Sequence, residues 1–298
     1  MTVLVRAPGK VNLHLSVGPR RPDGYHDLAT LFHAVSVYDE VTARPGVGVT
    51  LDVEGAQDIP RGPDNLAHRA AVALAGWAGV PADVALHVRK GIPVAAGMAG
   101  GSADAAATLV ACDALWRLRL SRAELLQVAA KLGSDVPFAL VGGTAVGIGR
   151  GEQVTPALTR GTFHWVFAVA DRGLSTPAVY AEIDRLRSGE RVPAPRVPDA
   201  VMSALRSGDA HALGRALSND LQRAACSLRH SVRLALDVGE ECGALGAVVS
   251  GSGPTCAFLV RDAEHGLDVA VGLSASGVAA TVLRATGPVS GARVVDAG

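Results

Sequence analysis

The chain has 298 residues, of which 49% are hydrophobic and 19% charged, and its 28 basic residues balance its 28 acidic ones. This composition is typical of a soluble globular protein with a substantial core in one large or two moderate domains, and we expect two. The balanced charge argues against a nucleic-acid partner or an anionic membrane surface.

The four cysteines form no C-x-x-C pair and are too few for a disulfide framework in a chain of this length. The first residues lack the basic and long apolar regions of a signal peptide, and no apolar run of roughly 18 residues or more occurs elsewhere. We therefore expect reduced thiols and a cytoplasmic location.

The first predicted element is a strand over residues 1–18, broken by Pro8-Gly9. After the break, apolar and polar residues alternate, so each kind lies on its own face of the strand. A polar face is ordinarily solvated, and here it carries Lys10, Asn12, His14 and Ser16. Lysine is rare among the basic residues, at positions 10, 90 and 131 alone, which suggests that Lys10 meets a need for a compact ammonium group.

A turn at Pro22-Asp23-Gly24 presents Tyr25 and His26 side by side. An aromatic ring can stack on a nucleobase while a neighbouring imidazole bonds its edge. The pair is therefore consistent with a nucleobase pocket, but a Tyr-His pair taken alone more often reflects ordinary loop packing.

The next stretch alternates between apolar and polar residues and predicts strands around Leu31 to Val41 and Val47 to Val53. A helix follows, with Asp64 as N-cap and its end near Gly79. A strand over Val84 to Val88 then leads into a glycine-rich run.

That run extends from Gly91 to Ala107 and opens directly into an alanine-rich helix. Glycines allow backbone N–H groups to approach a ligand, and about four N–H groups at a helix start have no intrahelical partner. The pattern predicts an anion site, with Ser102 at the N-cap, where its hydroxyl caps the helix or faces a phosphate or metal. The run is neither a Walker A loop nor a G-x-G-x-x-G fingerprint, and tight packing of a small-residue helix on a sheet would also explain it.

We expect this helix to run to about Leu115 and another to extend from a capping box at Ser121 to Gly133. Asp135 precedes Pro137 and fits a helix cap. Residues 142–151 predict a turn, a strand and a turn. We place the domain boundary beside them, giving an N-terminal domain over 1–152 and a C-terminal domain over 153–298.

The second half alternates strands with paired helices, which favours an α+β sandwich. Residues 188–199 contain three prolines and predict an exposed loop. The other predicted elements are a strand at 163–170, a helix from Ser175, helices over 209–225 and 227–243, strands at 247–250 and 255–260, a helix over 263–276 and a strand at 279–284.

Three stretches together resemble the GHMP small-molecule kinase family: Pro8 to Leu13, the glycine-rich run from Pro93 to Ala103, and the turn Ser250 to Thr255. Their order matches, and the resemblance covers nearly the whole chain. It implies an α+β fold of two domains, an N-terminal ribosomal-protein-S5-like domain and a C-terminal ferredoxin-like α/β sandwich.

The resemblance implies phosphoryl transfer from ATP, with Mg²⁺ accompanying the nucleotide, to a hydroxyl group of a small molecule. Residues 21–26 and 132–138 resemble family members whose substrate carries a cytidine diphosphate group and belongs to the non-mevalonate route to isoprenoids. Lys10 and Asp135 match the catalytic pair: Asp135 would orient and deprotonate the hydroxyl, and Lys10 would hold that carboxylate ionised.

The resemblance also assigns binding residues. The nucleotide would contact Pro93, Val94, Ala95, Ala96, Gly97, Met98, Ala99, Gly100, Gly101, Ser102 and Ala103, with Ser102 as a magnesium contact. The substrate would contact Asn12, Tyr25, His26, Phe32, Thr176 and Tyr180.

Four positions depart from the family pattern. Met98 stands where the family usually has Leu, Ala99 where it has Gly, Ala103 where it often has a second Ser, and Gln222 where a Glu is common. The loss of the second hydroxyl leaves Ser102 as the sole side-chain oxygen in the loop.

Two alternatives remain from the sequence. A homoserine or mevalonate kinase would share the fold but would not explain Gly24-Tyr25-His26, and a catalytically inactive ligand sensor would not explain Lys10 with Asp135. The nine histidines show no H-E-x-x-H spacing, so a metal hydrolase is not supported. We expect a monomer or homodimer.

Overall fold

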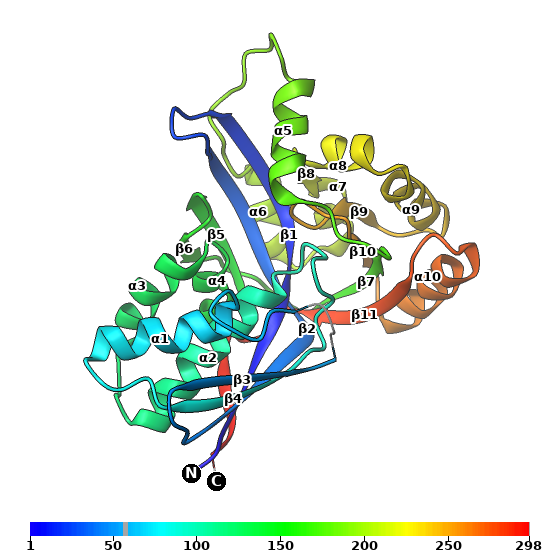
Figure 1. The fold of residues 1–298 in the computed structure, drawn as a ribbon. Helices are drawn as coiled ribbons and strands as arrows, with labels where there is room; N and C mark the ends of the chain where they lie inside the picture. The colour runs from blue at the N-terminus through cyan, green and yellow to red at the C-terminus, as the bar shows by residue number, and fades with distance from the viewer. Residues whose placement is uncertain (56–58, 298) are drawn as a thin grey trace.

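The computed structural model describes residues 1–55 and 59–297, which fold around two sheets (Figure 1). The first sheet has eight strands with a main path in the order β12-β1-β2-β4-β3; β5 pairs with β2 and β6, and β8 pairs with β1. Its strands are β1 (Val3–Arg20), β2 (His26–Arg44), β3 (Val49–Glu54), β4 (Val84–Arg89), β5 (Thr144–Gly149), β6 (Gln153–Pro156), β8 (Ser218–Asn219) and β12 (Arg293–Ala297).

The long antiparallel pair β1 and β2 runs through the molecule and reaches both of its halves (Figure 1). The predicted break at Pro8-Gly9 is wrong: β1 continues through it, and the interruption is a shift of register between Pro8 and Gly9. The polar face of β1 is not solvated either, because Lys10, Asn12 and His14 are all buried. Both faces of this strand are therefore covered at its middle.

Four helices cover the N-terminal part of the first sheet and share one apolar core with it (Figure 1). They are α1 (Leu66–Ala78), α2 (Gly100–Trp116), α3 (Arg122–Leu132) and α4 (Val136–Val141). The capping box at Ser121 is confirmed, with Glu124 as its partner. The cap of α1 is Asn65 rather than Asp64, because the Asn65 side chain accepts a hydrogen bond from the Ala67 N–H at 2.8 Å.

The predicted cap at Ser102 is wrong: the residue at the N-cap of α2 is Ala99, in a left-handed conformation, so Ser102 lies inside the first turn. Asp135 occupies the N-cap position of α4, as predicted, but its side chain makes no capping hydrogen bond. The carboxylate of Asp135 is therefore free for another role.

The second sheet is antiparallel in the order β11-β7-β10-β9, and this confirms the α+β sandwich. Alternate residues of β7 pack in opposite directions: Trp165 and Phe167 join the core shared with the first sheet, and Val166 and Ala168 join a core beneath α9 (His230–Glu241) and α10 (Ala263–Ser276). The strands are β7 (Phe163–Val169), β9 (Gly246–Val249), β10 (Cys256–Val260) and β11 (Thr281–Gly287).

The single helix predicted over 209–225 is instead two helices with a short strand between them. Ser218 and Asn219 pair with His14 and Leu15 of β1, which interrupts the helix. The helices of this half are α5 (Thr176–Leu186), α6 (Asp199–Ser207), α7 (Ala210–Ala216), α8 (Gln222–Leu228), α9 (His230–Glu241) and α10 (Ala263–Ser276).

The sheets do not divide at the predicted domain boundary. Strands β6, β8 and β12 all follow residue 152 and all belong to the first sheet, and the two termini lie together in Figure 1. The division into 1–152 and 153–298 stays a prediction. Within residues 1–55 and 59–297, no helix is both long and apolar enough to span a membrane.

Residues 188–198 form an irregular loop, as predicted, but the loop is attached to β1. The Arg196 carbonyl oxygen lies 2.9 Å from Nε2 of His14, and Pro195 lies against Gly18. This contact explains part of the burial of the polar face of β1.

Candidate active site

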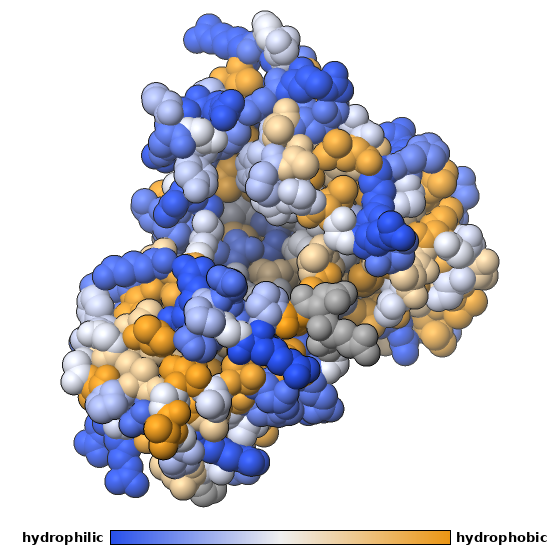
Figure 2. Space-filling view, viewed as in Figure 1, coloured by the Kyte–Doolittle hydropathy of each residue, from blue (hydrophilic) through white to orange (hydrophobic). Residues whose placement is uncertain are grey.

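One cavity of about 900 Å³ lies between the two halves of the molecule and receives side chains from both (Figure 2). Its walls include β1 and β2, the start of α2, the segment before α4, helix α5 and the turn after β9. The three stretches that carried the family resemblance therefore meet at one place.

The glycine-rich run forms one wall. Ala95, Gly97 and Ala99 all have positive φ angles, between 52° and 75°, so the backbone winds tightly before α2 begins. The first helical N–H groups, of Gly100, Gly101 and Ser102, have no acceptor of their own within the helix and lie at the cavity. Free N–H groups and the positive end of the helix dipole make this wall a site for anions.

Only part of the predicted nucleotide loop lines the cavity: Ala95, Ala96, Gly97, Ala99, Gly100, Gly101 and Ser102. Met98 and Ala103 are buried in the core, and Val94 is exposed. The departures Met98 and Ala103 therefore lie behind the wall. Gln222 supports the turn after β9, because its amide oxygen accepts a hydrogen bond from the Val249 N–H at 3.0 Å.

The loop is fixed to the turn that follows β9. Ser250 Oγ donates to the Gly97 carbonyl oxygen at 3.0 Å. A Cβ on Gly97 would lie 2.2 Å from the Ser250 carbonyl oxygen, so only glycine permits this approach. The turn itself is held by Asn219, whose amide donates to the carbonyl oxygens of Val249 and Gly251 at 2.7 Å each.

Lys10 is 4% exposed, and its ammonium group lies where the loop, β1 and the segment before α4 meet. It donates to Asn12 Oδ1 and to the Gly97 carbonyl oxygen, both at 2.6 Å, and lies 3.9 Å from Asp135 Oδ2. Burial lowers the pKa of Lys10 below 10.5, and the negative charge of Asp135 acts in the opposite direction. An ammonium group has three N–H donors. Two of them bond to Asn12 and Gly97 and hold the Lys10 side chain in place, and the third remains for Asp135 or a ligand.

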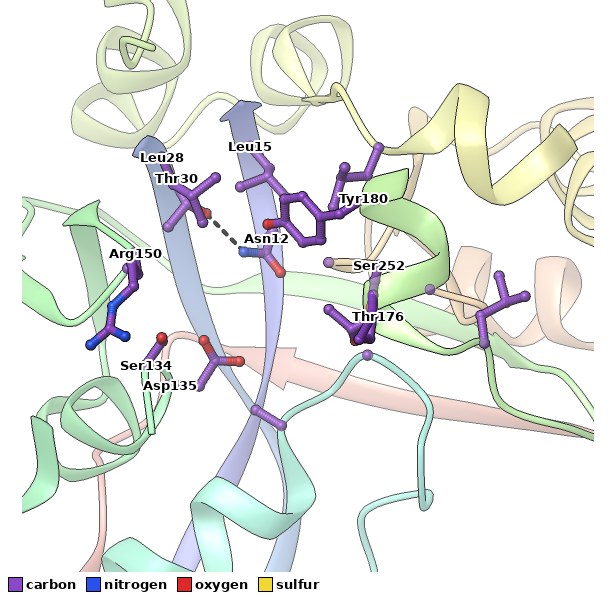
Figure 3. A pocket seen from close by; sticks show the side chains of 18 of the residues that line it. Asn12, Leu15, Leu28, Thr30, Ser134, Asp135, Arg150, Thr176, Tyr180 and Ser252 are labelled. Atoms are coloured by element: carbon purple, nitrogen blue, oxygen red, sulfur yellow. Dashed lines mark hydrogen bonds between the residues drawn. The ribbon is translucent and has the colours of Figure 1, made fainter. Parts of the chain in front are cut away.

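A chain of hydrogen bonds holds Asn12 in place behind Lys10. Asn12 Nδ2 donates to Thr30 Oγ1 at 2.7 Å, and that hydroxyl donates to the His14 carbonyl oxygen at 2.8 Å (Figure 3). Across the cavity, Thr176 Oγ1 lies 2.9 Å from Ser252 Oγ. Figure 3 shows Asn12 and Asp135 directed into the same space.

The far end of the cavity is aromatic. The rings of His26 and Tyr180 stack with their centroids 5.2 Å apart, and Tyr25 is 57% exposed beside them. Burial, with a contribution from the charge of Asp135, raises the pKa of Tyr180, so its ring stays neutral. Phe32 stacks on Phe138, with 4.8 Å between centroids, and also reaches the cavity.

Sequence reasoning missed several polar residues of the wall: Thr30, Ser134, Arg150, Asp184 and Ser252. Arg150 lies between two glycines with positive φ angles, and its guanidinium lies 5.5 Å from the Tyr25 ring centroid. The sequence alone does not mark Arg150 as a site residue. Arg150 comes close to Tyr25 only because β5 pairs with β2 in the folded sheet. Figure 3 shows its side chain beside Ser134, which puts a second cation in the cavity.

A buried charge cluster supports the base of the glycine loop. Lys90 Nζ bonds to Asp39 and, at 2.6 Å, to Asp104 on α2. Asp39 also accepts the N–H groups of Gly91 and Ile92, at 2.7 and 2.8 Å. Burial raises the pKa of Asp104, with the Lys90 ammonium opposing this effect. The cluster therefore links the first residues of the glycine loop to α2, the helix that follows the loop.

The residues present fit a magnesium ion carried by a nucleotide better than one held by the protein alone. Ser102 and Asp135 both line the cavity and offer oxygen atoms. In the described part of the chain, no group of three His, Cys, Asp or Glu side chains is arranged to hold a metal. Magnesium in nucleotide sites is commonly bound by one or two carboxylates together with phosphates and waters.

Comparison with known proteins is consistent with this geometry. The family model of the GHMP kinases N terminal domain matches residues 65–143, and that of the GHMP kinases C terminal matches residues 201–279. A protein of Streptomyces avermitilis named 4-diphosphocytidyl-2-C-methyl-D-erythritol kinase is 57% identical over 297 residues, covering 99% of this chain and 100% of its own length.

Among solved structures, a crystal structure of 4-(cytidine 5'-diphospho)-2C-methyl-D-erythritol kinase matches with a TM-score of 0.78 and 33% identity, covering 96% of this chain and 98% of its own. A homoserine kinase from Cytophaga hutchinsonii matches with a TM-score of 0.75 over 99% of this chain, but at 17% identity it shows the fold alone.

Proposed function

The chain belongs to the 4-diphosphocytidyl-2-C-methyl-D-erythritol kinases of the GHMP kinase family, and we propose that it transfers the γ-phosphoryl group of ATP to the 2-hydroxyl of that cytidylyl compound. The products are the 2-phosphate and ADP, in the non-mevalonate route to isoprenoids. The observation that carries the proposal is a single cavity that joins free helix N–H groups, the Lys10–Asp135 pair and an aromatic end.

The nucleotide phosphates lie on the glycine wall in this proposal, with residues 93–103 forming the loop around them. The free N–H groups of Gly100, Gly101 and Ser102 supply donors without a mobile side chain. Phosphoryl transfer passes through a loose transition state with charge on the equatorial oxygens, so fixed donors and nearby cations supply much of the catalysis. Lys10, Arg20 and Arg150 are the lysine and arginine residues that line the cavity.

Asp135 orients the acceptor hydroxyl and takes its proton. A carboxylate is a much weaker base than an alkoxide, so the proton moves late, after the hydroxyl has begun to bond to phosphorus. Lys10 stabilises the charge on this side of the transition state, and its hydrogen bonds to Asn12 and Gly97 keep it within 3.9 Å of Asp135. Asn12 and Thr176 contact the substrate.

The cytidine lies at the aromatic end. Tyr25 and Tyr180 offer faces for stacking, His26 offers a ring nitrogen to the edge of the base, and Phe32 lines the wall. A homoserine or mevalonate substrate has no base to occupy this end.

Mg²⁺ would accompany the nucleotide, with Ser102 and Asp135 as the side chains able to hold it. When bound, the ion neutralises phosphate charge and polarises the transferred group. The proposal places the enzyme in the cytoplasm, as a monomer or homodimer.

The test is ADP release by the purified protein with ATP and Mg²⁺, using the cytidylyl compound, homoserine and mevalonate as separate acceptors. Turnover with the cytidylyl compound alone is expected. Lys10→Met should abolish it, and Lys131→Met is the matched control, because Lys131 lies on α3 over the Trp77 ring, outside the cavity. Turnover with another acceptor would overturn the substrate, and none with any acceptor would favour an inactive ligand sensor.

A further inference from the structure

The buried charge cluster of Asp39, Lys90 and Asp104 lies behind the glycine wall, and no step of the proposed phosphoryl transfer uses it. Its members come from β2, from the residue after β4 and from α2, and each side chain is at most 5% exposed. A Cβ placed on Gly100, the first residue of α2, would lie 3.3 Å from Lys90 Nζ and 3.4 Å from Asp39 Oδ2. The cluster therefore lies directly against the residue with which α2 begins at the cavity.

The charge cluster fixes both ends of the glycine-rich run. Asp39 Oδ1 accepts the N–H groups of Gly91 and Ile92 at the start of the run, at 2.7 and 2.8 Å, and its Oδ2 accepts from Lys90. Lys90 also donates to Asp104 Oδ2 at 2.6 Å, just past the first turn of α2. Hydrogen bonds between charged groups are stronger than those between neutral ones. The position of the first turn of α2 therefore depends on a short path of strong bonds from β2.

One ammonium group faces two carboxyl groups in the cluster, so the net charge depends on which of them holds a proton. Asp39 accepts from three donors, whereas Asp104 accepts from Lys90 and its Oδ1 has no partner among the described residues. Hydrogen bonds to a carboxylate favour its ionised form. Burial raises the pKa of Asp104, the Lys90 ammonium opposes the rise, and the Asp39 carboxylate adds to it. Asp104 is therefore the group that takes the proton, which leaves the cluster without net charge.

The net charge of the cluster acts on the nucleotide phosphates. The positive end of the α2 dipole attracts them, and a negative charge on Asp104, so close to the first turn, would oppose that attraction. We propose that Asp39, Lys90 and Asp104 are positioning residues for ATP: they hold the first turn of α2 against the phosphates, with Asp39 as the charged partner of Lys90 and Asp104 as a neutral acceptor. The proposal rests on the proposed function, since it places the phosphates on the glycine wall.

The experiment makes the same chemical change at two positions, Asp39→Asn and Asp104→Asn. Calorimetric titration with a non-hydrolysable ATP analogue gives the dissociation constant. Asp39→Asn leaves one side-chain oxygen where two are needed, so either the glycine run or Lys90 loses its partner, and the dissociation constant should rise about 10- to 100-fold. Asp104→Asn keeps a neutral oxygen for Lys90, so the dissociation constant should change by less than about threefold.

Two further variants complete the test. Asp104→Leu has a similar size but no acceptor for Lys90, so it should weaken binding of the ATP analogue by about 10-fold. Asp113→Asn is the matched control and should keep the affinity, because Asp113 lies near the other end of α2, where it accepts the Leu120 N–H outside the cavity.

Two other readouts separate this role from a general effect on folding. KM for the cytidylyl substrate, measured at saturating ATP, should stay within about threefold of the unmodified value in every variant that folds by circular dichroism. The infrared difference spectrum between the unmodified protein and Asp104→Asn should contain the C=O band of a protonated carboxyl group.

The outcomes separate the claims. A folded Asp39→Asn that binds the ATP analogue as tightly as the unmodified protein would overturn the positioning role, as would an equal rise in KM for the cytidylyl substrate. If Asp39→Asn does not fold, an unchanged affinity in Asp104→Leu overturns the role in its place. An Asp104→Asn variant as weak as Asp104→Leu, or a missing infrared band, would overturn the neutral state of Asp104. Failure of the unmodified protein to bind the ATP analogue would instead overturn the nucleotide site of the proposed function.

Discussion

Replacing Asp135 by asparagine removes one negative charge and almost nothing else. The Asp135 side chain is 32% exposed and makes no cap hydrogen bond to α4, and among the described residues its one ion pair is the contact with Lys10 at 3.9 Å. Asparagine has the same shape, and Lys10 keeps its hydrogen bonds to Asn12 and Gly97. We therefore expect Asp135→Asn to fold normally, with a melting temperature within about 3 °C of the unmodified protein.

The catalytic loss should be large. A positioned general base contributes roughly 10²- to 10⁴-fold to the rate, or about 3 to 5 kcal/mol in activation free energy. In the proposed site the phosphates lie against the N–H groups at the start of α2, and asparagine keeps a side-chain oxygen for the magnesium ion of the nucleotide, so the ATP dissociation constant should change by less than about threefold. Stopped-time ADP release gives kcat, and calorimetric titration with a non-hydrolysable ATP analogue gives the affinity.

A pH profile adds an independent readout. Burial already lowers the pKa of Lys10, and the charge of Asp135 partly offsets that effect. Without this charge the pKa of Lys10 falls further, so the residual activity should begin its alkaline decline at a lower pH in Asp135→Asn. Asp237→Asn is the control, because Asp237 pairs with Arg233 on α9, away from the cavity. A kcat near that of the unmodified protein would refute the reasoning, as would an equal loss of ATP affinity.

Three other predictions follow from single residues. Tyr25→Ala should raise KM for the cytidylyl substrate about 10- to 100-fold and leave KM for ATP unchanged, because base stacking is worth about 1–3 kcal/mol; equal losses for both substrates would indicate a folding defect. Ala99→Gly should raise the free energy of unfolding by about 1 kcal/mol, since Ala99 has φ of 62°, and a lower melting temperature would contradict this. Burial lowers the pKa of His33 from 6.5 to about 3, so the unfolded chain binds the proton first, and stability should fall as the pH drops through this range. In urea titrations at several pH values, His33→Leu should lose part of that acid sensitivity; an unchanged pH dependence would contradict the assignment.

The elements that a local pattern encodes could be predicted from the sequence. The glycine run before an alanine-rich helix, the capping box at Ser121 and the alternation along β1 each depend on residues near one another in the chain. The pairing of Lys10 with Asp135 was inferred from the family resemblance, and their 3.9 Å separation is consistent with it. Their catalytic roles await the experiments above.

What depends on distant contacts could not be predicted. The helix expected over 209–225 is interrupted because Ser218 and Asn219 pair with β1, and nothing local signals a strand of two residues. Serine favours a helix cap, so the sequence predicts Ser102 at that position, but Ala99 adopts the left-handed conformation and the helix begins at Gly100. Asp184 has no motif of its own, and its contact with His26 joins residues that lie 158 positions apart in the chain.

Phosphorus NMR of the reaction products tests the central claim most directly. The protein is incubated with ATP, Mg²⁺ and the cytidylyl substrate, and the spectrum is followed until ATP is consumed. Our account requires one new phosphomonoester signal, coupled to the methylerythritol carbon framework at the 2-position, with the cytidine diphosphate signals intact and one ADP formed per monoester. Release of inorganic phosphate with ADP and no monoester, or a monoester elsewhere on the substrate, would contradict it.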